Sequence, residues 1–205
     1  MYDSLKSFLQ PFVQLSEEEF AFLTAHVIYK EYPKKQLLIQ EGEIEQHLYF
    51  INKGIIHQYF YKGEEMVTTD IVSEGTITGS VASFLSRKPS HYFLETLEPV
   101  TALVISRHGL DALYKSDIKW QRFGRILITH FLLQQELYLL DMIRYPIRER
   151  FVRFAATYPE LLQRVPQRRL ASYLQIEPET FTRLKPLLQE KKKPASKKNE
   201  SSNNV

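Results

Sequence analysis

Near the carboxyl end, residues 179–183 have side chains suited to reading DNA bases. Glu179 and Arg183 are four residues apart, so on a helix they lie on one face, one turn from each other. A glutamate carboxylate can accept a hydrogen bond from the cytosine amino group, and an arginine guanidinium can bind O6 and N7 of guanine together. This spacing predicts a helix that reads adjacent G·C pairs.

The surrounding residues, 165–188, predict two short helices joined by a tight turn. In the first helix, Leu170, Ala171 and Leu174 have the spacing of a buried face. Glu177 and Pro178 then form a typical helix start, because proline fits the first helical position. The apolar residues expected to point inward from the second helix are Phe181, Leu184 and Leu188, which leaves Glu179, Thr180, Thr182 and Arg183 exposed.

At these residues the chain resembles the Crp/Fnr family of bacterial transcription regulators, whose recognition helix has Glu, two residues, a Ser, Thr or Gly, and then Arg. The resemblance implies a winged helix-turn-helix that binds a palindromic operator in double-stranded DNA as a homodimer and works with RNA polymerase. Thr180 and the cluster Gln167, Arg168 and Arg169 would then hold phosphates and fix the docking register. The DNA-binding residues implied are Gln167, Arg168, Arg169, Glu179, Thr180, Thr182 and Arg183. The alternative is a solvated helical hairpin whose surface charges have no role.

Two residues depart from the family pattern. Gln175 stands in the turn where family members usually have a small residue, often glycine. Pro186 lacks an amide proton and would clash with the carbonyl of Thr182, at a cost of about 3 kcal/mol. We therefore expect the reading helix to kink or end near Lys185, after the base-contacting residues.

The charge of the chain is unevenly divided. The formal net charge is +3, but residues 1–115 hold 10 Lys and Arg against 15 Asp and Glu, whereas residues 116–205 hold 17 against 9. A basic carboxyl half suits a module that approaches phosphates, attached to a separate sensor. A solvated basic tail at Lys191–Lys198 accounts for part of the excess.

Composition excludes several classes of protein. The chain has no cysteine, which removes disulfides, thiolate catalysis and cysteine-bound iron–sulfur clusters. The amino-terminal residues lack the apolar core of a secretory signal. The most apolar run, Ile126–Ile143, is interrupted by polar residues, so we expect no membrane span. Resemblance to bacterial regulators implies a cytoplasmic protein.

From Lys30 to about Ile105, short apolar runs alternate with turn signals, as in a sandwich or barrel of antiparallel strands. Asn52-Lys53-Gly54 and Lys62-Gly63-Glu64 are expected to be hairpin turns. A capping box at Ser16 and Glu19 predicts a helix before this stretch. The segment with QEGE at Gln40–Glu43 resembles the cyclic-nucleotide-binding β-roll. The predicted fold class is α+β: an antiparallel, jelly-roll-like β-roll with flanking helices, a long helix and a helical DNA-binding domain.

A long helix is expected over residues 116–143. Apolar residues at intervals of three and four form a seam, and further apolar residues widen it, so two faces should be buried. In the family, such a helix packs on its own β-roll and on the same helix of a second subunit. The dimer-interface residues implied are Phe123, Ile126, His130, Leu133, Leu137 and Leu140. The alternative is a core helix of a monomer.

Pro146 should end this helix and open a hinge between sensor and reader. The expected domains are a sensor β-roll at 1–115, a dimerisation helix at 116–145, a DNA-binding domain at 146–190 and a disordered basic tail at 191–205.

The effector site is expected to differ from that of cyclic-nucleotide binders. By the resemblance, the ribose and phosphate sites correspond to Gly79-Ser80 and Ser90-His91-Tyr92. The family's glutamate and arginine are absent there, and a neutral pair recovers little of the energy of a charge-assisted bond. The candidate effector pocket is Gly79, Ser80, Ser90 and His91, for an unknown small molecule rather than cyclic AMP.

No catalytic or metal centre is predicted. The histidines His47, His57, His91 and His108 are too scattered for a cupin-type iron site, and we expect no metal and no cofactor. The sequence predicts a non-enzymatic regulator; the alternative is a small-molecule-binding or cupin-like β-roll with no DNA-reading role.

Overall fold

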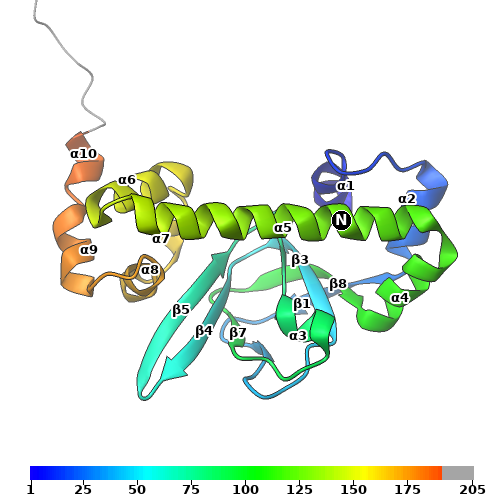
Figure 1. Cartoon of the computed structure of the whole chain (residues 1–205), viewed down its shortest axis with the longest axis horizontal. Coiled ribbons are helices and arrows are strands. Elements are labelled where there is room, and N and C mark those ends of the chain that lie inside the picture. Colours follow the sequence, from blue (N-terminus) through cyan, green and yellow to red (C-terminus); the bar gives the residue numbers. More distant parts are fainter. Residues whose placement is uncertain (191–205) are drawn as a thin grey trace, which may run out of the picture. The chain divides into compact units, whose positions relative to one another are not determined.

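The computed structural model describes residues 1–190. Within it, the chain forms two compact units, Met1–Tyr138 and the residues from Leu139 onward. Figure 1 shows the strands gathered in the first unit and helices in the second.

Two short helices open the first unit, α1 (Asp3–Leu9) and α2 (Glu17–Thr24). The predicted capping box is confirmed: Ser16 Oγ accepts from the Glu19 amide, and Glu19 Oε2 accepts from the Ser16 amide at 2.7 Å. The Glu19 carboxylate also accepts from Lys119 Nζ at 2.6 Å, which ties α2 to the start of the long helix. Bonding to Lys119 and to the Ser16 amide keeps the pKa of Glu19 below its usual value.

Eight strands form two four-stranded antiparallel sheets, as predicted for a jelly-roll-like domain. The order in one sheet is β1-β8-β3-β6 and in the other β2-β7-β4-β5. The strands are β1 (Val27–Tyr32), β2 (Leu37–Ile39), β3 (His47–Lys53), β4 (Ile56–Lys62), β5 (Glu65–Val72), β6 (Ile77–Thr78), β7 (Phe93–Thr96) and β8 (Val100–Ser106).

Two apolar clusters hold this unit together. One lies between the sheets and contains Ile51, Ile56 and Leu94, all with no exposed surface. The other joins the helices to the first sheet through Leu9, Phe50 and Trp120, among others. Burying such side chains stabilises the fold by about 1.5 to 3 kcal/mol each.

Glycine occupies both predicted hairpin turns, but only one of them is a hairpin. Gly54 has φ +102°, and a Cβ there would lie 2.6 Å from the Pro99 carbonyl oxygen, so a larger residue does not fit. Gly63 joins β4 to β5 with φ +63°. The hairpin at Gly63 is confirmed, because β4 and β5 pair with each other. The hairpin predicted at Asn52-Lys53-Gly54 is wrong, because this turn carries the chain from β3 in one sheet to β4 in the other.

Three helices complete the first unit and lead out of it: α3 (Val81–Ser86), α4 (Arg107–Ser116) and α5 (Ile118–Arg144). The long helix ends at Arg144, before Pro146, as predicted. By length and composition alone α5 is apolar enough to cross a membrane, with a mean hydropathy of 1.2 over its most apolar 18 residues. Its polar interruptions therefore do not by themselves exclude a span.

The described part of the second unit continues with helices only. They are α6 (Ile147–Thr157), α7 (Leu161–Arg164), α8 (Gln167–Tyr173), α9 (Pro178–Leu184) and α10 (Leu187–Glu190). Phe151, Leu170 and Phe181 are almost completely buried, and the rings of Phe151 and Phe181 meet edge to face at 5.1 Å. Residues 139–190 contain no strand, so the β-hairpin of a wing is not found among them.

Candidate functional site

The turn between α8 and α9 is tight although it contains Gln175 where a small residue was expected. Gln175 has φ +54°, in the left-handed region where glycine is preferred. Its amide donates to Ser172 O and the Ile176 amide donates to Ala171 O, both at 3.0 Å, which is the Schellman pattern of hydrogen bonds. The glutamine therefore keeps a tight turn at a backbone cost of about 1 to 2 kcal/mol.

The bounds of α9 follow from its two prolines. Pro178 occupies the first helical position after Glu177, as predicted. The helix ends at Leu184 with Lys185 as its C-cap, and α10 begins after Pro186. Glu179 and Arg183 both lie inside the helix, so the break does not remove them.

The surface of α9 holds the side chains that the sequence singled out. Glu179, Thr182 and Arg183 are exposed and Thr180 is half-buried. Arg183 Nη2 donates to Thr180 Oγ1 at 3.0 Å, one turn back along the helix. This bond holds the guanidinium along the exposed face of α9.

Gln167 and Thr182 connect the two helices. Gln167 Nε2 donates to Thr182 Oγ1 at 2.5 Å and to the Pro178 carbonyl at 3.3 Å, and Thr182 Oγ1 donates to the same carbonyl. Arg168 is exposed and Arg169 is half-buried on α8. Gln167 and Thr182 thus have an interhelical role that the sequence did not indicate.

In the β-roll, three of the four predicted effector residues come together. Ser90 Oγ lies 2.8 Å from Ser80 Oγ, and both serines are buried. Gly79 precedes Ser80 with φ +151°, and a Cβ there would press on the His47 carbonyl at 3.1 Å. His91 is exposed, so it does not join this group.

Sequence reasoning missed Glu45, which lies against these residues. Its side chain is 2% exposed, and Glu45 Oε2 accepts from the Ser80 amide at 3.2 Å. Burial raises the pKa of the Glu45 carboxyl, while hydrogen bonds from the His47, Ser80 and Gln46 amides oppose that rise. The site therefore contains a carboxylate where an incoming phosphate would need positive charge.

A second carboxylate, Asp70, and two tyrosines have perturbed ionisation in the β-roll. Asp70 lies two residues before Val72 on β5, on the same face of the strand as this residue of the core between the sheets, and burial raises the pKa of Asp70 to about 6. Burial and the nearby Glu45 raise the pKa of Tyr32 to about 12 and also raise the pKa of Tyr49.

The predicted dimer residues on α5 divide into two groups. Phe123 packs on the chain's own core, Ile126 is half-buried, and the His130 ring lies 5.1 Å from that of Phe12. Leu133, Leu137 and Leu140 remain exposed. The exposed apolar surface also includes residues outside the predicted seam, among them Leu132, Leu139 and Ile143.

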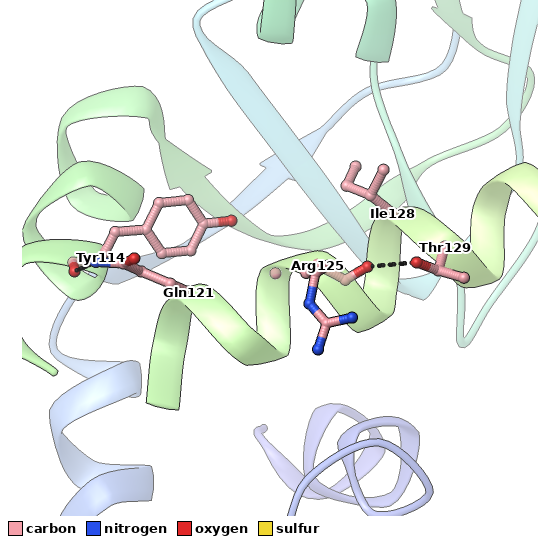
Figure 2. A pocket seen from close by; sticks show the side chains of 6 residues that line it. Tyr114, Gln121, Arg125, Ile128 and Thr129 are labelled. Atoms are coloured by element: carbon pink, nitrogen blue, oxygen red, sulfur yellow. Dashed lines mark hydrogen bonds between the residues drawn. The ribbon is translucent and has the colours of Figure 1, made fainter. Parts of the chain in front are cut away.

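A shallow hollow of about 570 Å³ opens between α4 and α5. Tyr114 lies against the backbone of Gly124 there, where a Cβ would clash with the phenol oxygen. Figure 2 shows the Arg125 guanidinium turned away from the Tyr114 ring, and Thr129 Oγ1 bonded to the Arg125 carbonyl. None of the predicted site residues lines this hollow.

Comparison with known proteins identifies the β-roll. Residues 29–117 match the family of cyclic nucleotide-binding domains. This segment is less than half of the chain. A search of curated proteins gives no significant match.

Solved structures with a similar fold include bacterial regulators. The catabolite activator protein of Thermus thermophilus is 19% identical, with a TM-score of 0.55 over 88% of this chain and 86% of that one. FixK2 of Bradyrhizobium japonicum is 18% identical, with a TM-score of 0.64 over 80% and 85%. The c-di-GMP-responsive regulator CLP of Xanthomonas campestris is 17% identical, with a TM-score of 0.61 over 84% and 91%. The chain thus has the fold of these regulators, including helices beyond the β-roll.

Proposed function

We propose that this chain is a sequence-specific DNA-binding transcription regulator of the Crp/Fnr type that acts as a homodimer. The observation that carries the proposal is the exposed pair Glu179 and Arg183, one turn apart on α9, which packs on α8 across a tight turn. The fold shared with bacterial regulators supports it.

The chemistry of the pair suits direct readout in the major groove. Arg183 would leave Thr180 and bind O6 and N7 of a guanine, and Glu179 would accept from the amino group of a neighbouring cytosine. Arg168 and Arg169 would bind phosphates, with the basic carboxyl half supplying general attraction to DNA. Gln167 and Thr182 would instead fix the angle between α8 and α9, because they bond to each other.

Dimerisation would use the exposed apolar surface of α5. Leu132, Leu133 and Leu137 are all more than half exposed. A large exposed apolar surface on a protein in water is usually an interaction site. Glu136, Gln134 and Gln135 are exposed in the same turns, which disfavours lipid as the partner and favours another helix with a polar rim. A twofold dimer would present two copies of α9 to two half-sites of a palindrome.

In this proposal the β-roll is the sensor domain, at residues 1–115, the helix at 116–145 dimerises, and residues 146–190 read DNA. The effector, if one is used, is not a cyclic nucleotide, because the residues predicted to hold the phosphate have no arginine and the Glu45 carboxylate lies beside them.

Selection of bound fragments from random DNA tests the proposal. Purified full-length protein should enrich an inverted repeat containing G·C pairs, with half-site centres about 34 Å apart or a multiple of that distance. Arg183→Ala should lose the enriched sequence, whereas Lys62→Ala, which removes a cation from the exposed β4–β5 hairpin, should keep it. Recovery of no common sequence by the unmodified protein would contradict the proposal.

A further inference from the structure

Glu45 is the most enclosed charged side chain of the β-roll. It lies just before β3, and its backbone amide donates to Ser83 Oγ at 3.0 Å. Its Oε1 accepts from the amides of Gln46 and His47, both at 3.0 Å, and its Oε2 accepts from the Ser80 amide at 3.2 Å. Three backbone donors therefore converge on one carboxylate.

Two of these donors belong to the residues directly after Glu45, and the third comes from a segment that is distant along the chain. Gln46 and His47 precede and begin β3, whereas Ser80 joins β6 to α3. Ser80 in turn contacts Ser90, in the segment before β7. The carboxylate thus joins the start of β3 to the segment between β6 and α3, and Ser80 of that segment bonds to Ser90 of the predicted effector site.

Converging backbone amides are a common way for proteins to bind an anionic ligand. Here the anion belongs to the chain. The three amides already donate to the Glu45 carboxylate, and the Ser80 and Ser90 hydroxyls are bonded to each other. The negative charge of the carboxylate would repel a second anion beside it. A buried carboxylate without these bonds would be costly, so the amides and the carboxylate depend on each other.

We propose that Glu45 is a built-in ligand of the β-roll, which takes the place of a soluble anionic effector and keeps the start of β3 joined to the segment between β6 and α3. This inference rests on the proposed function, since it assigns the regulation of the same sensor site. It follows that the β-roll is fully ordered without a nucleotide, and that DNA binding does not wait for one.

Chemical rescue tests this inference on the full-length protein, without DNA. Glu45→Ala leaves a cavity that exposes three amides, and the melting temperature should fall by more than about 5 °C. Sodium acetate should then raise the melting temperature of this variant saturably, relative to sodium chloride at the same ionic strength, because acetate binds only the folded state. The unmodified protein and the control Glu41→Ala, which changes an exposed glutamate of the same loop, should show no such rise.

A folded Glu45→Ala variant that is insensitive to acetate, or that melts with the unmodified protein, would overturn the inference. If Glu45→Ala does not fold, Glu45→Gln supplies the test, because it keeps the volume and removes one acceptor oxygen. Hydrogen exchange should then accelerate at least about tenfold at the amides that face the new NH2 group, which are either that of Ser80 or those of Gln46 and His47, while β4–β5 amides are unchanged. Unchanged exchange at all three amides would overturn the inference.

The two proposals fail separately. Acetate rescue with no sequence-specific DNA binding would reject the regulator function, and the built-in ligand would remain as a property of the β-roll. Sequence-specific binding without acetate rescue would keep the regulator and reject the role of Glu45.

Discussion

Replacing Leu133 and Leu137 together by Asp should separate the proposed dimer. Both leucines lie on the exposed apolar surface of α5, with 51% and 55% of their surface accessible. Neither is needed for the described core of the first unit, so the variant should fold as a monomer.

The magnitude follows from the exposed fractions. Complete burial of a leucine side chain contributes about 1.5 to 3 kcal/mol, so burying the remaining half gives about 1 kcal/mol for each of four side chains in the dimer. Loss of about 4 kcal/mol alone raises the dissociation constant about a thousandfold. Unpaired carboxylates buried at the interface add about 3 kcal/mol or more.

Sedimentation velocity measures this change. At about 10 μM, a concentration at which specific association is normally seen, we expect a dimer for the unmodified protein and a monomer for the double variant. Gln135→Asp is the matched control, because Gln135 is exposed in the same stretch but lies two residues from each leucine, on the opposite side of the helix, and this variant should remain dimeric. A monomeric unmodified protein at tens of micromolar, or a double variant that still sediments as a dimer, would refute the reasoning.

Three further predictions concern single side chains and the effector. In a double-mutant cycle, Gln167→Ala and Thr182→Val should show a coupling energy of about 1 kcal/mol in unfolding experiments, because both remove the same interhelical bond. If the two changes in the free energy of unfolding are additive, this bond does not stabilise the fold. Burial raises the pKa of Asp70 from 3.8 to about 6, so the folded state binds this proton more tightly than the unfolded state does. The free energy of unfolding should therefore fall as the pH rises from about 4 to 6 and Asp70 loses the proton. In denaturant titrations, the free energy of unfolding of Asp70→Asn relative to that of the unmodified protein should therefore increase by up to about 3 kcal/mol between pH 4 and pH 7. A difference in the free energy of unfolding that does not change with pH would contradict this. Millimolar cyclic AMP or cyclic GMP should leave the melting temperature unchanged, whereas a saturable increase would show that the pocket holds a cyclic phosphate.

Local signals explain what could be predicted. Glycine at the 54 and 63 turns, Pro146 after the long helix and Pro178 at the start of α9 all act on the backbone within a few residues, so their effects are readable from the sequence. The alternating apolar runs between them predicted the antiparallel strands for the same reason.

The remaining features depend on contacts between distant residues. Glu45 lies in the polar stretch EGEIEQ, which is typical of a solvated loop, and its burial comes from Ser80 and Ser83, more than thirty residues away. The seam on α5 similarly identifies apolar faces without showing which one the chain itself covers. Phe12 contacts His130, so the exposed surface is shifted toward Leu132 and Ile143.

The central claim is that α9 reads bases through Arg183, and the ratio of affinities for a selected site and for random DNA tests it most directly. Arg183→Ala should weaken binding to the selected site by about 1 to 3 kcal/mol and leave binding to random DNA nearly unchanged, since a lost base contact affects only the specific complex. Arg168→Ala, which removes a proposed phosphate contact, should weaken both alike and leave the ratio unchanged. An unchanged ratio in Arg183→Ala would contradict the assignment of α9 as the reading helix.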